Sequence, residues 1–81
     1  MRLVKTCDAW PEQYDVYEGD RQVGYLRLRH GSFTVECPDC GGEEVYHAYT
    51  HGDGLFDSDE REFHLNMAQA AIGQWLARKA K

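Results

Sequence analysis

Two neighbouring segments, residues 25–29 and 32–37, alternate strictly between apolar and polar side chains. Their apolar members are Leu26, Leu28, Phe33, Val35 and Cys37. This alternation is typical of β-strands that bury one face. A two-residue turn at His30-Gly31 would bring the apolar residues of one segment opposite those of the other, whereas a slip of one residue would not. The pattern therefore predicts a central β-hairpin.

Two flanking segments extend this hairpin. Residues 14–18 predict a strand with Tyr14 and Val16 on the core side. Residues 43–50 predict a fourth strand, but the facing of this strand stays open because most of its residues tolerate burial. A short edge strand over residues 2–6 is a further alternative.

From Ser58 the apolar spacing changes to that of an amphipathic helix. Asp57 as N-cap with Glu60 three residues later predicts a capping box, and basic residues follow near the end. This interpretation also accounts for the acids of residues 53–60, whose spacing differs from that of a calcium-binding EF-hand loop. The residues expected on the buried side of the helix are Leu65, Ala68, Ala71, Ile72, Trp75 and Leu76.

The pattern as a whole predicts an α+β fold. We expect a single domain over residues 1–81, with a four-stranded antiparallel β-meander and one C-terminal α-helix packed on one face (ββββα, two layers). The opposite face would be uncovered and would display Tyr25, Arg27 and Arg29 beside Ser32, Thr34 and Glu36.

Charge narrows the classes of partner. The chain of 81 residues has a net charge of −5, and residues 36–62 hold nine acids against one arginine. This balance disfavours duplex DNA, which needs accumulated positive charge. The sequence has no membrane-spanning run and no signal-peptide pattern, which predicts a cytoplasmic protein. An odd number of cysteines, three, favours thiols over a disulfide framework.

The segment Cys37-Pro38-Asp39-Cys40 has the spacing of half a zinc site. Cys7 is the best third ligand, because His47 would lie roughly 15 Å along the fourth strand from the two thiolates. The structural alternative is a hairpin turn in which Cys37 is a small core residue. We expect no cofactor unless these cysteines hold zinc.

The uncovered face supports three hypotheses. If Val45 opposes Glu36, then His47 joins the row of Arg27, and His47 and Glu36 could move protons in phosphodiester cleavage beside the arginines. The same face could bind RNA by stacking bases on tyrosines. Tyrosine and arginine are also enriched where proteins meet proteins.

The runs "GYLRLRHGSFTV" and "CPDCGGEEVYHA", followed by "GDGLFDSDERE" opening a helix, resemble small proteins of unknown function from bacterial, phage and prophage genomes. This resemblance implies an accessory protein that modulates a host protein. It carries over no functional residue.

We therefore expect a non-enzymatic, cytoplasmic interaction module that binds a protein partner, or forms a homodimer, through its uncovered sheet face. A zinc-stabilised domain and an RNA-binding or phosphodiesterase-like protein are the alternatives. The binding residues that we predict are Tyr25, Arg27, Arg29, Glu36 and His47.

Overall fold

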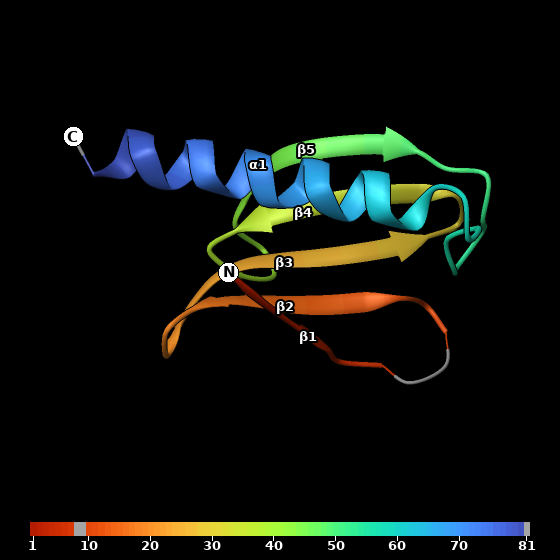
Figure 1. Cartoon of the computed structure of the whole chain (residues 1–81), viewed down its shortest axis with the longest axis horizontal. Helices are drawn as coiled ribbons and strands as arrows, with labels where there is room; N and C mark the ends of the chain where they lie inside the picture. The colour runs from red at the N-terminus through yellow and green to blue at the C-terminus, as the bar shows by residue number, and fades with distance from the viewer. Residues whose placement is uncertain (8–9, 81) are drawn as a thin grey trace.

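An antiparallel sheet lies against one C-terminal helix in the computed structural model, which describes residues 1–7 and 10–80 (Figure 1). The sheet has five strands in the order β1-β2-β3-β4-β5, so each strand pairs with its neighbour in the chain. The elements are β1 (Arg2–Lys5), β2 (Gln13–Glu18), β3 (Arg21–Arg29), β4 (Ser32–Cys37), β5 (Glu43–Tyr49) and α1 (Arg61–Lys79).

The α+β class is confirmed, but the prediction of four strands is wrong. The fifth strand is β1, which pairs with β2 at the edge of the sheet and corresponds to the edge strand that the sequence offers as an alternative over residues 2–6. It has only four residues, and of these Leu3 alone is partly buried. Four residues are too few for an alternating pattern to distinguish a strand from a loop, so the sequence predicts this strand only as an alternative.

The central hairpin has the predicted register. Leu28 pairs with Phe33 and Leu26 pairs with Val35. The turn residues His30 and Gly31 have φ values of 54° and 73°. Positive φ at both positions is the signature of the two-residue type I′ turn, whose twist matches that of the strands.

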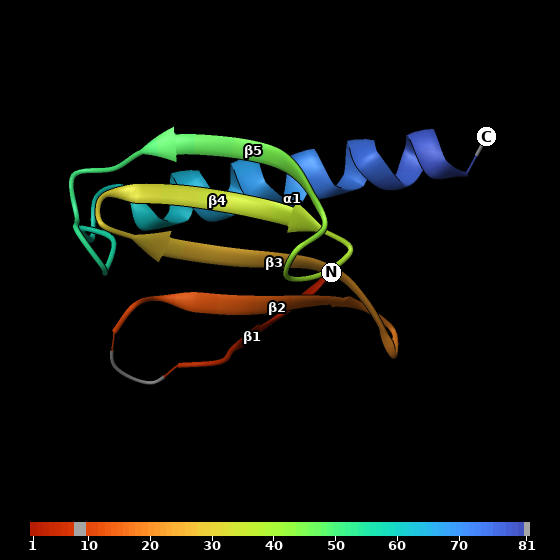
Figure 2. The ribbon, with the colours of Figure 1, turned by 180° about the vertical axis from the view of Figure 1, so that it is seen from behind.

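The core forms between the helix and the apolar face of β3 and β4. Leu26, Phe33 and Val35 are almost completely buried, and Ala68 and Ile72 of α1 pack with them. The helix contacts β3, β4 and β5 and leaves the other face of the sheet uncovered; Figure 2 shows the strands in front of α1.

Gly24 of β3 lets the helix approach the sheet closely. A Cβ atom at this position would lie 2.5 Å from Cδ1 of Ile72, which is itself fully buried. A larger residue would therefore push the helix away from β3.

The helix begins at Arg61, three residues after the predicted start at Ser58. Half of the predicted capping box is present, since the Glu60 carboxylate accepts a hydrogen bond of 2.9 Å from the backbone N–H of Asp57. The same carboxylate also accepts from the N–H groups of His51 and Gly52. Glu60 thus holds the backbone of the connection from β5 to α1 in place.

Within the described part of the chain, no helix has both the length and the apolar character to cross a bilayer.

Candidate functional site

Polar side chains form rows across the uncovered face of the sheet, because antiparallel partners point to the same side. We call the row Asp15, Tyr25, Glu36 and Glu44 the acidic row. We call the next row along the strands, Gln13, Arg27, Thr34 and His47, the arginine row. Arg29, Ser32 and Tyr49 follow beyond it. All five predicted binding residues therefore lie on one face.

The acidic row gathers carboxylates from β2, β4 and β5 around Tyr25. One oxygen of Glu36 accepts a hydrogen bond of 3.1 Å from the backbone N–H of Gly41, which draws this carboxylate toward the β4–β5 turn. Burial raises the pKa of the Tyr25 hydroxyl, and the charges of Asp15 and Glu36 add to this, whereas Arg27 acts in the opposite direction. Tyr25 therefore remains a neutral aromatic group between charges.

A register shift brings His47 into the arginine row. The sequence leaves the facing of this strand open, and the pairing of Val45 with Glu36 is one alternative; in the structure Glu36 pairs with Glu44, and the register shifts between Val35 and Glu36. His47 nevertheless pairs with Thr34, because Val45 is the extra residue on β5. The facing of this strand depends on that irregularity, which no apolar pattern in residues 43–49 signals.

The residues predicted for acid–base cleavage do not converge. His47 Nε2 lies 2.7 Å from the hydroxyl of Ser32, and its ring lies edge-on to Tyr49 with centroids 5.0 Å apart. Glu36 instead bonds to Gly41 at the opposite end of β4. The proposed base and acid therefore turn away from each other along the strand.

Two arginines are available to a partner at the other end of the face. Among the described residues, neither Arg27 nor Arg29 has a carboxylate within ion-pairing distance. Tyr49, on the same face and across Ser32 of β4 from Arg29, is 83% exposed. The face is thus negative at the acidic row and positive at Arg27 and Arg29, with exposed aromatic area at Tyr49 on β5.

The three cysteines are not brought together. Cys37 points into the core, where burial raises the pKa of its thiol to about 11, and Cys40 is exposed. Cys7 follows the end of β1 that pairs near Tyr14, whereas Cys37 ends β4 at the opposite end of the sheet. Three strand spacings and about four residues along the strand separate them, roughly 20 Å. The predicted sulfur ligands are therefore not assembled in this fold.

His51, Asp57 and Asp59 place one ligand atom each within 4.8 Å of one another at the start of the helix. All three side chains are exposed. Carboxylates at this position are also favoured by the partial positive charge of the helix N-terminus. The helix start accounts for this arrangement without a bound ion.

A buried charge network escaped the sequence analysis. The carboxylate of Glu12 is fully buried and accepts two hydrogen bonds from Arg61, at 2.9 and 3.1 Å. It also accepts from the Tyr14 hydroxyl and from the backbone N–H of Phe56. Burial alone would raise the pKa of Glu12, but these donors lower it below the usual value. A single acidic residue before a strand does not indicate from sequence that its side chain will be buried.

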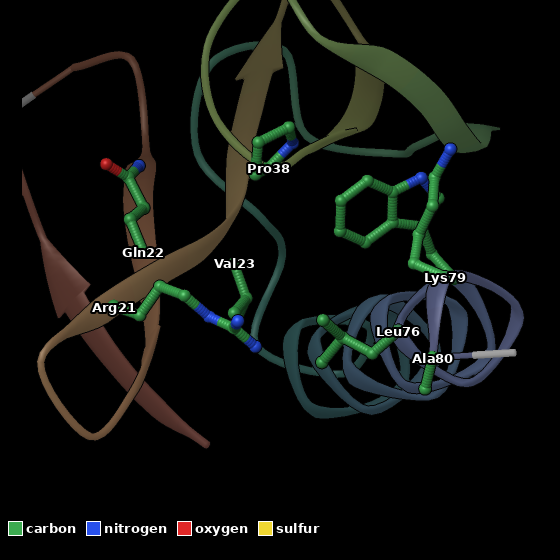
Figure 3. A pocket seen from close by; sticks show the side chains of 8 residues that line it. Arg21, Gln22, Val23, Pro38, Leu76, Lys79 and Ala80 are labelled. Atoms are coloured by element: carbon green, nitrogen blue, oxygen red, sulfur yellow. The ribbon is translucent and has the colours of Figure 1, made fainter.

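A second missed feature is a cavity of about 280 Å³ between the end of α1 and the start of β3. Figure 3 shows the Arg21 side chain extending from β3 toward Leu76 of the helix. Val23, Pro38 and Trp75 line the apolar part. Lys79 lies over the Trp75 ring, with its ammonium group 5.6 Å from the ring centroid. The cavity thus combines an apolar wall with two basic side chains.

The sequence matches no protein family, and no solved structure matches it. It is similar to a segment of calmodulin-binding transcription activator 4 from Arabidopsis thaliana, with 35% identity over 57 residues. These residues make up 70% of this chain but only 6% of the plant protein. The similarity therefore concerns a small part of that protein.

Proposed function

We propose that this protein is a non-enzymatic interaction module that binds protein through the uncovered face of its sheet. The observation that carries the proposal is the uneven charge of that face. Among the described residues, Arg27 and Arg29 have no carboxylate partner, and the exposed ring of Tyr49 lies on the same face two strands away. Arginine and tyrosine supply most of the binding energy at many protein interfaces. The separated negative and positive regions of this face would also orient a charged partner as it approaches.

The alternative functions have less support. Phosphodiester cleavage needs an acid and a base that act on one substrate, and His47 and Glu36 turn in opposite directions. A zinc site needs ligands within bonding distance of one metal, and Cys7 is far from Cys37. RNA binding would place phosphates beside the three carboxylates of the acidic row, which repel them.

A capture experiment tests the proposed face. The tagged chain and its double variant Arg27→Glu/Arg29→Glu are compared for the proteins that they retain, each identified by mass spectrometry. We expect the variant to lose the bound protein, because like charge replaces both arginines, while its circular dichroism spectrum stays unchanged.

A matched control distinguishes the effect of where the charge is changed from the effect of the change in net charge. Arg78→Glu/Lys79→Glu makes the same change of net charge at the far end of α1, away from the face. This control should retain the bound protein. Capture that persists with Arg27→Glu/Arg29→Glu, or that is lost equally with the control, would contradict the proposed face.

A further inference from the structure

We infer that the partner of the uncovered face is a second copy of this chain, seated face to face by a two-fold axis that runs across the strands between the acidic row and the arginine row. This inference rests on the proposed function, and it adds the identity of the partner. It follows from the order of charges along the strands.

Symmetry restricts how the face can meet its own copy. A two-fold axis along the strands would place the acidic row against itself, and like charges opposite one another are destabilising. An axis across the strands reverses their direction and exchanges the two rows. The acidic row of one copy then faces the arginine row of the other.

The exchanged rows are complementary residue by residue. Tyr25 would face Arg27 of the other copy, which suits stacking of a guanidinium on an aromatic ring. Because neighbouring strands lie about 4.8 Å apart, the same guanidinium would enter between Asp15 and Glu36. On the outer strand, Glu44 would face His47. Each complementary contact occurs twice in the dimer.

The size of the face sets the expected strength. Five strands about 4.8 Å apart and about seven residues at 3.3 Å each give a face of roughly 20 by 23 Å. This is less than the approximately 800 Å² per partner of a standard interface. The dimer should therefore be weak, with a dissociation constant of roughly tens to hundreds of micromolar.

Charge reversal in separate chains tests the arrangement. Sedimentation equilibrium of the full chain from about 5 to 500 µM should show a shift from one to two chains, and about 0.5 M salt should weaken it. Arg27→Glu alone and Glu36→Arg alone should each weaken self-association by about thirtyfold or more, because each substitution is repeated by symmetry. Lys79→Glu, which lies on the helix, should have no effect.

An equal mixture of the two variants gives the decisive result. In a mixed dimer, the carboxylate introduced by Arg27→Glu in one chain would lie beside the guanidinium introduced by Glu36→Arg in the other. The unchanged Arg27 of the second chain would lie beside the unchanged Glu36 of the first. The mixture should therefore associate with nearly the wild-type affinity although neither variant does so alone. Circular dichroism of each variant confirms that it is folded.

Two results would overturn this inference. The wild type could remain a single chain at 500 µM, or the mixture could fail to associate while the wild type does so. Either result leaves the proposed function intact, since that function is tested separately, by capture of another protein with Arg27→Glu/Arg29→Glu and the control Arg78→Glu/Lys79→Glu.

Discussion

At the scale of single residues, the buried carboxylates of Glu12 and Glu60 hold together parts that are distant in the chain. Glu12 lies just before β2, yet it binds Arg61 at the start of α1 and the backbone of Phe56 in the connection. Glu60 gathers three backbone N–H groups from residues 51–57. Buried charge is tolerated only where such donors replace water.

Removing Arg61 should therefore be costly. Arg61→Ala leaves the buried Glu12 carboxylate with only the Tyr14 hydroxyl and the Phe56 N–H, and we expect a loss of about 3 kcal/mol in the free energy of unfolding. Urea denaturation followed by tryptophan fluorescence measures this loss. The matched control Arg78→Ala removes an exposed ion pair with Glu43 and should cost less than about 1 kcal/mol. Equal losses for the two variants would contradict the role of Glu12.

The cysteines should differ in reactivity. Cys40 is exposed, whereas Cys37 is buried and its thiol has a pKa of about 11, so Cys37 holds almost no thiolate at neutral pH. In the folded protein at pH 7.5, a maleimide reagent should modify Cys40 within minutes and Cys37 only after denaturation. Peptide mass spectrometry distinguishes the sites. Rapid modification of Cys37 in the folded protein would show that the β4 end is open.

At the scale of elements, two glycines should respond oppositely to alanine. At Gly24 the added methyl group meets buried Ile72, and we expect Gly24→Ala to cost about 1–3 kcal/mol. At Gly73 within α1 the nearest atom to the added methyl group is the terminal carbon of Met1, at 3.8 Å, so Gly73→Ala should stabilise the protein by about 1 kcal/mol. Thermal unfolding of both variants checks the two signs.

A second substitution tests whether the contact with Ile72 causes the loss of stability in Gly24→Ala. Ile72→Val removes the Cδ1 atom that the new methyl group would meet. In the double variant Gly24→Ala/Ile72→Val, the two costs should therefore be less than additive. Strict additivity would mean that strand propensity, and not the contact with the helix, sets the cost.

The strands and the helix also show which parts of the fold can be predicted from the pattern of apolar and polar residues. Leu26, Leu28, Phe33 and Val35 and the two-residue turn determine the pairing together, because a slip of one residue would place apolar residues opposite polar ones. The facing of β5 depends on one irregular pairing at Val45, which polarity does not encode. Strand alternation predicts which residues lie on the uncovered face, whereas Glu12 and Arg61 are 49 positions apart and no local pattern indicates that they meet.

At the scale of the whole molecule, stability should fall in acid. Burial would raise the pKa of Glu60, but N–H donors from His51, Asp57 and Gly52 lower it to about 2, compared with a usual value of 4.5. Because the folded state holds the proton less tightly than the unfolded state, the stabilisation is present above about pH 4.5 and is lost as the pH falls toward 2. The lowered pKa of Glu12 acts in the same direction.

Urea titrations at several pH values measure this dependence. The free energy of unfolding should decrease steadily between pH 4.5 and pH 2. Glu60→Gln should be less stable at neutral pH and should show a shallower decrease, since the titrating group is absent. An unchanged slope in Glu60→Gln would assign the acid sensitivity to other carboxylates.

The order of the strands has a consequence for how the chain folds. Each strand pairs with the one that precedes or follows it, so pairing within the sheet closes only short loops. The hydrogen bonds between Glu12 and Arg61 join residues 49 positions apart. Folding should thus begin with the β3–β4 hairpin and end when α1 docks, so Arg61→Ala should speed unfolding far more than it slows folding.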